Sequence, residues 1–146
     1  MATSYLLDAG PLGLLAHNRP ARRIPMQNWV LQEVTAGSTI YISEVADYEV
    51  RRELTRLIRA GQLPASRLDR LNRLAKLFTY LPVSTAMWQR AADLWADARR
   101  HGLPTAGAAT LDADVPVAAQ AADVGAIVVT SNPGHIGRWV PVRPWP

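Results

Sequence analysis

The stretch 111–132 constrains the fold most strongly, because in it an alanine-rich segment leads directly into an apolar run. Small side chains let a helix lie close on a sheet. The run from Ala126 to Val129 is apolar at every position, which is typical of a parallel strand buried on both faces. Gly125, between the two, is a typical helix stop. The close-packing alanines are Ala118, Ala119, Ala121 and Ala122.

The rest of the chain repeats this alternation of strand and helix. Apolar or β-rich runs predict strands over 4–7, 39–42, 79–83 and 126–129, with an edge strand within 139–145. Helical spacing predicts helices over 12–17, 26–34, 44–61, 64–78 and 85–102, with Ser43 and Ser84 as caps. The segment 101–107 is predicted to be a loop. This order indicates an α/β fold with a mainly parallel sheet covered on both sides, in one domain spanning 1–146.

Composition excludes several classes of protein. A chain of 146 residues with 49% hydrophobic and 19% charged residues suits an ordinary globular domain. Apolar runs are too short to span a bilayer, and Asp8 interrupts the N-terminal run before a signal-peptide core could form, so we expect a cytoplasmic protein and no membrane partner. The absence of cysteine rules out disulfides and thiolate metal sites.

The net charge of +4 comes almost entirely from arginine, since all but one of the 16 basic Lys and Arg residues are arginines. A guanidinium is a planar fork that matches a phosphate well. This composition permits polyanion binding, although a solvated charged surface would also explain it.

Four acids follow or precede predicted elements in a way that suggests a shared site. Asp8 ends the first strand, Glu49 lies in the helix after the second, and Asp112 and Asp114 precede the alanine-rich helix. Carboxylates brought to one sheet edge repel one another unless a cation neutralises them, and oxygen ligands suit Mg²⁺ or Mn²⁺. The alternative is separate local roles, as turn former for Asp8, surface residue for Glu49 and helix caps for the two aspartates.

Four segments, in order, resemble the motifs of the PIN domain family, specifically VapC-type toxins. They are YLLDAGPL at 5–12, ISEVADYEV at 42–50, LDADVPVAAQA at 111–121 and VTSNPGHI at 129–136. The resemblance implies a three-layer α/β/α sandwich, an Mg²⁺- or Mn²⁺-dependent endoribonuclease and a VapB-type antitoxin partner that blocks the site. It also implies that Asp8, Glu49 and Asp114 are the catalytic, metal-binding acids.

The chain departs from the family pattern at several positions. Ala9 stands where a hydroxyl residue is frequent, and Asn132 stands where many members carry a fourth acid. An asparagine can ligate a metal through its carbonyl but adds no charge, which favours one firmly bound ion over two. Pro116 fits only a first helical turn and so places the helix start next to Asp114. His135 is a candidate substrate contact or an ordinary loop histidine.

Asp112 and Asp114 lie two residues apart, so they can face one ion only if the chain between them is not helical. We expect an extended or turn segment there, since Pro116 disfavours helical geometry at Val115. Asp114 would then contact the metal and Asp112 would act through a water, whereas the alternative is a cap that accepts a backbone N–H.

Two further expectations concern partners. Trp88 and Trp95 lie on one helical face, where packing is the ordinary role and a stacking platform the alternative. With the leucine-rich helices they also offer apolar surface for a homodimer. A housekeeping PIN nuclease in RNA processing and an inactive PIN-like binding module remain the alternatives to a toxin.

Overall fold

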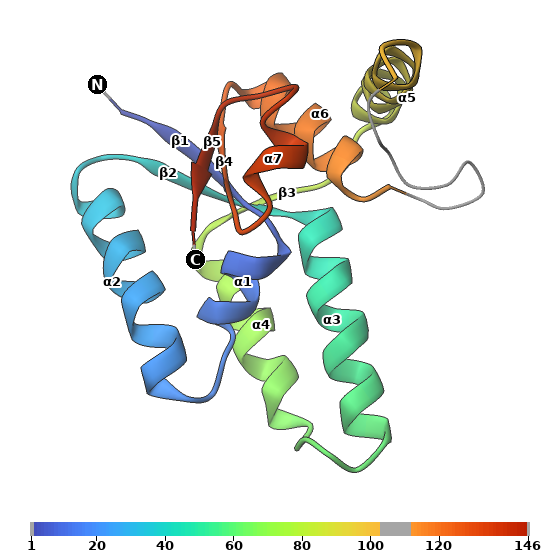
Figure 1. Ribbon diagram of the computed structural model, residues 1–146. Helices are drawn as coiled ribbons and strands as arrows, with labels where there is room; N and C mark the ends of the chain where they lie inside the picture. The colour runs from blue at the N-terminus through green and yellow to red at the C-terminus, as the bar shows by residue number, and fades with distance from the viewer. Residues whose placement is uncertain (1, 103–111, 146) are drawn as a thin grey trace.

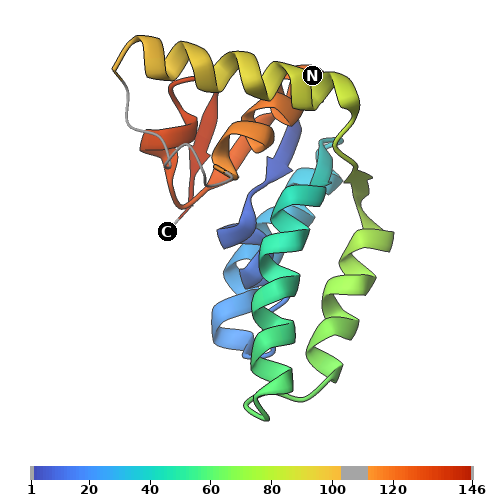
Figure 2. The same cartoon turned by 90° about the vertical axis from the view of Figure 1, so that its right-hand side faces the viewer.

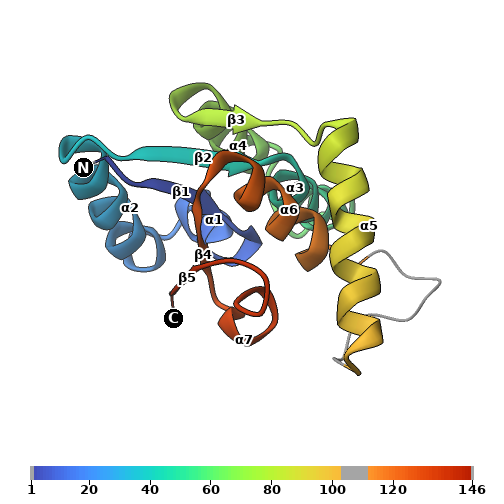
Figure 3. The same ribbon diagram turned by 90° about the horizontal axis from the view of Figure 1, so that it is seen from above.

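A computed structural model describes residues 2–102 and 112–145 of the chain. Its strands form one five-stranded sheet in which every neighbouring pair is parallel, in the order β3-β2-β1-β4-β5 (Figure 3). The strands are β1 Ser4–Leu7, β2 Thr39–Ser43, β3 Thr79–Leu81, β4 Ile127–Thr130 and β5 Val142–Pro144. The strand order reverses direction between β1 and β4, and such switch points are where open α/β sheets bind ligands.

Helices cover both faces of this sheet (Figure 1). They are α1 Ala9–Leu15, α2 Pro20–Thr35, α3 Glu44–Arg59, α4 Ser66–Leu77, α5 Thr85–Arg100, α6 Asp114–Val124 and α7 Pro133–Ile136. Buried residues of α1 to α4 pack on one face, and those of α6 and α7 pack on the other. Helix α5 lies across α6, while α3 and α4 lie side by side and extend beyond the sheet (Figure 2). The predicted three-layer α/β/α sandwich is confirmed.

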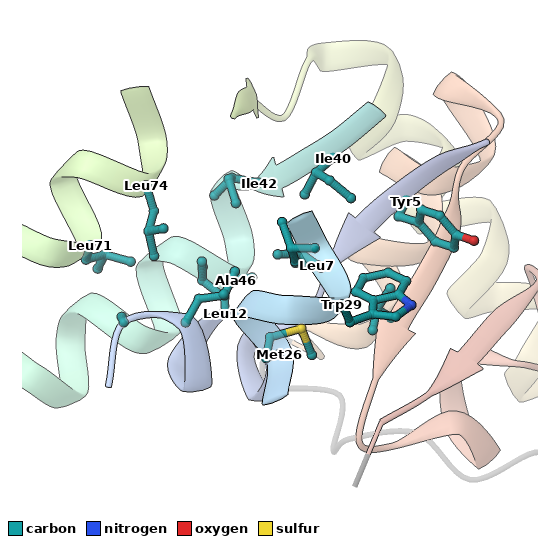
Figure 4. Packing of buried hydrophobic residues seen from close by; sticks show 14 of the residues in the cluster. Tyr5, Leu7, Leu12, Met26, Trp29, Ile40, Ile42, Ala46, Leu71 and Leu74 are labelled. Atoms are coloured by element: carbon teal, nitrogen blue, oxygen red, sulfur yellow. The ribbon is translucent and has the colours of Figure 1, made fainter. Parts of the chain in front are cut away.

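The central strand β1 supplies both halves of the core. Leu7 points toward α1 and α2, where it packs near Leu12, Met26 and Trp29 (Figure 4). Leu6 points the other way and packs with Val117 and its neighbours on α6. Leu6 and Leu7 are fully buried, as expected of a parallel strand covered on both faces.

Local signals placed several element ends correctly. The Ser43 hydroxyl accepts a hydrogen bond from the backbone N–H of Ala46 at 3.2 Å, and Ser84 accepts one from Met87 at 3.1 Å. Both serines therefore cap the helices that follow them, as predicted. Gly125 ends α6 in the left-handed conformation with φ of 65°, where glycine avoids the steric cost of a Cβ.

Other element ends differ from the prediction. Helix α1 begins at Ala9 and not at Leu12, since Pro11 is tolerated within a first turn. Helix α2 begins with Pro20 in its first turn and continues through Pro25, which lacks the N–H for one helical bond, so the predicted start at Met26 was too late. The short helix α7 was not predicted.

Two predictions about the alanine-rich region and α5 also change. Val115 is helical, so the effect of Pro116 on its neighbour did not hold, although Pro116 does lie in the first turn as expected. Trp88 is 44% exposed, and Met87 is the residue that fills the core there. Apart from His101 and Gly102, the loop predicted over 101–107 lies outside the described residues.

A buried glutamine joins three elements at the carboxyl end of the sheet. Gln120 of α6 accepts a hydrogen bond from the Ser43 hydroxyl at 2.6 Å through Oε1. Its Nε2 donates to the backbone carbonyl of Leu81, at the end of β3, at 2.7 Å. Because Ser43 also caps α3, the glutamine ties the start of that helix to β3 and α6. Both polar ends of Gln120 are thus satisfied in a fully buried setting.

We expect Gln120→Leu to lower the free energy of unfolding by about 2 to 4 kcal/mol, because the buried Ser43 hydroxyl proton loses its acceptor and the Leu81 carbonyl loses its side-chain donor. Urea denaturation followed by circular dichroism measures this change. Gln89→Leu, at an exposed position of α5, is the matched control and should be nearly neutral. Equal effects of the two variants would contradict the tying role of Gln120.

Candidate active site

Asp8 occupies the end of the central strand. It follows β1 directly, and its backbone N–H continues the parallel ladder by donating to the carbonyl of Val129 at 3.0 Å. Its side chain is 8% exposed and accepts a hydrogen bond from the Thr130 hydroxyl at 2.8 Å. A buried carboxylate needs such a donor, so Thr130, a residue without an assigned role in the sequence prediction, fixes the orientation of Asp8.

Thr130 also organises the loop after β4. Its hydroxyl oxygen accepts a hydrogen bond from the backbone N–H of Asn132 at 2.9 Å while its proton goes to Asp8. Thr130 is fully buried. This arrangement is a local turn built by a threonine hydroxyl, so the ends of β1 and β4 are held together by one side chain.

Glu49 reaches the same region from α3. Burial raises the pKa of its carboxyl, and the negative charge of Asp8 and, more weakly, that of Asp114 raise it further against the lowering effect of Arg52. Glu49 is half-buried and lines the cavity between α1 and α3. Glu49 therefore lies at the edge of this cavity.

Asp114 is the first residue of α6. Burial raises the pKa of its carboxyl, and the charges of Asp8 and Asp112 add to this effect, while His135 and Arg138 oppose it. The side-chain amide of Asn132 donates to Asp114 Oδ2 at 3.3 Å, and His135 Nδ1 lies 3.9 Å from the same oxygen. The sequence prediction had identified Asn132 and His135 but not Arg138.

Asp112 lies in a turn before α6. Its Oδ1 accepts a hydrogen bond from the backbone N–H of Asp114 at 3.2 Å, and its carbonyl accepts one from Val115. Ala113 between the two aspartates has helical dihedral angles, so the segment is a turn and not extended. The structure thus contains the capping contact that was the alternative to a metal role for Asp112.

The structure therefore brings together acids from three separate elements, the end of β1, α3 and the start of α6. Burial is the larger cause of the raised pKa values of Glu49 and Asp114, and repulsion by the neighbouring carboxylates adds to it. Asp47, which the sequence prediction passed over, is also a buried acid of α3. Arg51 neutralises it with two hydrogen bonds of 3.1 and 3.2 Å. Asp8, Glu49 and Asp114 form no such pair with an arginine among the described residues.

The donor chemistry of this acid cluster fits a hard divalent cation, since its ligands would be carboxylate oxygens and their repulsion is what a cation relieves. The side chains are not closed around a binding position, however. Among residues 2–102 and 112–145, no three His, Cys, Asp or Glu side chains are gathered closely enough to hold a metal ion. A bound ion would have to draw the carboxylates together.

We expect Asp8→Asn to lower the pKa of both Glu49 and Asp114, because it removes a negative charge that raises each of them. A pKa raised by folding means that the folded state favours the protonated carboxyl. The charged carboxylates therefore lower the stability of the folded protein at neutral pH, and this destabilisation disappears as the pH falls below the unfolded pKa. The metal-free variant should therefore be more stable than the parent at neutral pH, with the gain lost in acid. Carboxyl ¹³C NMR titration measures both pKa values.

Glu53→Gln is the control for this titration, because Glu53 is exposed and pairs with Arg56. It should leave both pKa values where they are. Unchanged values in Asp8→Asn would mean that Asp8 does not share a site with the other two acids.

Comparisons with known proteins agree with this geometry. The VapBC2 complex of Rickettsia felis bound to a promoter DNA fragment contains a chain that superposes with a TM-score of 0.76 at 17% identity, covering 99% of this chain and 100% of that one. VapBC-1 of nontypeable Haemophilus influenzae gives 0.69 at 16% identity, covering 98% of both. FitAcB of Neisseria gonorrhoeae gives 0.65 at 20% identity, covering 94% and 95%. At these identities the likeness establishes the fold.

A comparison with curated protein sequences gave no match. Within the described residues, no helix is both long and apolar enough to cross a lipid bilayer. The family model for the PIN domain matches residues 5–136, a span that includes all the acids described above. The chain therefore belongs to the PIN domain family.

Proposed function

We propose that this protein is a metal-dependent endoribonuclease and the toxin of a VapBC-type toxin–antitoxin pair. The observation that carries the proposal is that the charge of Asp8, at the switch point of a PIN-domain sheet, adds to burial in raising the pKa of both Glu49 and Asp114. Structural neighbours that are VapBC complexes support the choice of a toxin over other PIN nucleases.

Asp8, Glu49 and Asp114 would hold Mg²⁺ or Mn²⁺, with Asn132 as a further oxygen donor and Asp112 acting through a water. Such an ion would supply an activated water and stabilise the charge that develops on an RNA phosphodiester under in-line attack. Thr130 keeps one oxygen of Asp8 engaged and so leaves the other for the cation. The amide of Asn132 performs the same orienting role for Asp114.

We further propose a VapB-type antitoxin as the partner that silences the site, and a homodimer as the assembly. An arginine of the antitoxin would pair with the carboxylates in place of the ion. Trp88 on α5 and Tyr48 on α3 are large exposed side chains that a second copy could cover.

We expect cleavage of RNA to require Mg²⁺ or Mn²⁺ and to stop when the ion is chelated. Turnover should also fall to a small fraction in each of the single variants Asp8→Asn, Glu49→Gln and Asp114→Asn, because each loses one ligand charge. Their far-UV circular dichroism should match that of the parent, since little side-chain volume changes. A gel assay with a long single-stranded RNA measures turnover.

Asp112 provides the graded comparison. Asp112→Asn keeps an oxygen that can accept the Asp114 N–H but loses the charge, so it should weaken Mn²⁺ binding by about tenfold with little loss of stability. Asp112→Ala should also lower the melting temperature, because it removes the turn contact.

For the cleavage prediction, full activity in chelator, or wild-type turnover in any of the three acid variants, would contradict the proposed site.

A further inference from the structure

A groove leads away from the acid cluster between α1 and α3. Its cavity volume is about 440 Å³, which lies within the range of small-molecule sites. The α1 wall carries only small residues, namely Ala9, Gly10, Gly13 and Ala16. We call this cavity the α1–α3 groove.

At the centre of the α1 wall, packing does not require a residue as small as Gly13. A Cβ added to Gly13 would lie 3.9 Å from Val50 Cγ2, an ordinary van der Waals contact, and glycine costs about 0.5 to 1 kcal/mol relative to alanine in a helix interior. The missing side chain leaves the groove open at a cost in helix stability, which favours a role for the open space.

The groove runs along α1, from the acids to a basic end. Ala9 follows Asp8 at one end, and Ala16 precedes His17 at the other. Arg67 of α4 lines the groove and is also close enough to His17 to lower the pKa of its imidazole, after the larger effect of burial. The seven residues of α1 span roughly 10 Å, the length of about three stacked nucleotides at ~3.4 Å each.

Arg67 has the chemistry of an unused anion ligand. Its Nε is buried and has no hydrogen-bond partner among the described residues. No carboxylate in the described part of the chain forms an ion pair with Arg67, Arg70 or Arg73. Burial lowers the pKa of the Arg70 guanidinium, and the charges of Arg23, Arg73 and Arg67 lower it further. These arginines therefore gather positive charge that the protein itself leaves uncompensated.

The other arginine of the groove is placed differently. Arg52 acts electrostatically on Glu49 and stacks over the Tyr48 ring at 5.2 Å. Its charge is therefore already directed at an acid and an aromatic ring. This leaves the guanidinium fork of Arg67 as the group in the groove best suited to a phosphate.

We propose that Arg67, at the basic end of the α1–α3 groove, binds a backbone phosphate of single-stranded RNA. This phosphate lies a few nucleotides from the phosphate that is cleaved at the acid cluster. The inference rests on the proposed ribonuclease function, because that function places a strand at the groove's acidic end. An acidic protein segment is the competing occupant, but the proposed function gives no reason for such a segment to lie in the groove.

Binding of a short fluorescein-labelled single-stranded RNA of mixed sequence, followed by anisotropy in chelator, tests this. Arg67→Gln should weaken binding roughly tenfold and reduce the slope of log K against log salt by about 0.7, the value for one phosphate contact on a single strand. Arg67→Lys should recover part of the affinity, since it restores the charge without the fork. Arg90→Gln, which removes an exposed arginine of α5, is the charge-matched control and should bind like the parent.

Gly13→Met tests the groove without altering charge. Its side chain should fill the groove and weaken RNA binding while the protein melts no lower than the parent. Equal losses of RNA affinity in Arg67→Gln and Arg90→Gln would overturn the inference, and so would unchanged RNA binding in Gly13→Met. It would also be overturned if the protein bound polyglutamate through Arg67 and did not bind RNA. Because binding is measured without metal, a protein that binds RNA through Arg67 but never cleaves it would contradict the proposed nuclease alone.

Discussion

The parallel pairing of β1 with both β2 and β4 is the constraint on which the site depends. Parallel strands end at the same edge of a sheet, so the residue after β1, the helix after β2 and the loop after β4 must meet there. These are Asp8, helix α3 and the loop at Ser131 and Asn132, which Thr130 at the end of β4 joins to Asp8. A one-residue slip of β1 would move Leu6 and Leu7 to opposite faces and disrupt the packing of both cores, so the core packing also fixes the position of Asp8.

The acid cluster opposes this stability. Desolvation and like charge raise the pKa values of Glu49 and Asp114, which means that the folded protein at neutral pH holds charges it would be more stable without. The surrounding residues limit the cost by local hydrogen bonds from Thr130 and Asn132. A bound cation would relieve this repulsion, and the proposed anion at Arg67 would compensate the positive charge at the other end of the α1–α3 groove.

Most of the layout could be predicted from local sequence signals. Ser43, Ser84 and Gly125 mark element ends because caps and left-handed turns depend on a few adjacent residues. Asp8 could be placed at the end of β1 because a strand end is a local feature. The Gln120 contacts with Ser43 and Leu81 could not be predicted, since they join residues 77 and 39 positions apart in the chain.

The prolines misled the prediction in a different way. Pro11 and Pro20 lie in first helical turns, where proline is tolerated, while Pro25 lies inside α2, where its cost depends on packing that a sequence pattern does not reveal. The role of Thr130 was missed because its hydroxyl matters only once β4 lies beside β1. The capping contact of Asp112 was foreseen as an alternative, and the structure contains it.

The central claim is that the three acids share one divalent cation, and paramagnetic broadening by substoichiometric Mn²⁺ tests it most directly. In ¹⁵N spectra of the full chain, the claim predicts that amide signals near Asp8, Glu49 and Asp114 broaden first and together, and that Asp8→Asn abolishes the effect at all three. Signals near Asp93 and Asp97 of α5 should stay sharp. Broadening centred on those α5 acids, or broadening near Asp114 that persists in Asp8→Asn, would contradict a shared site.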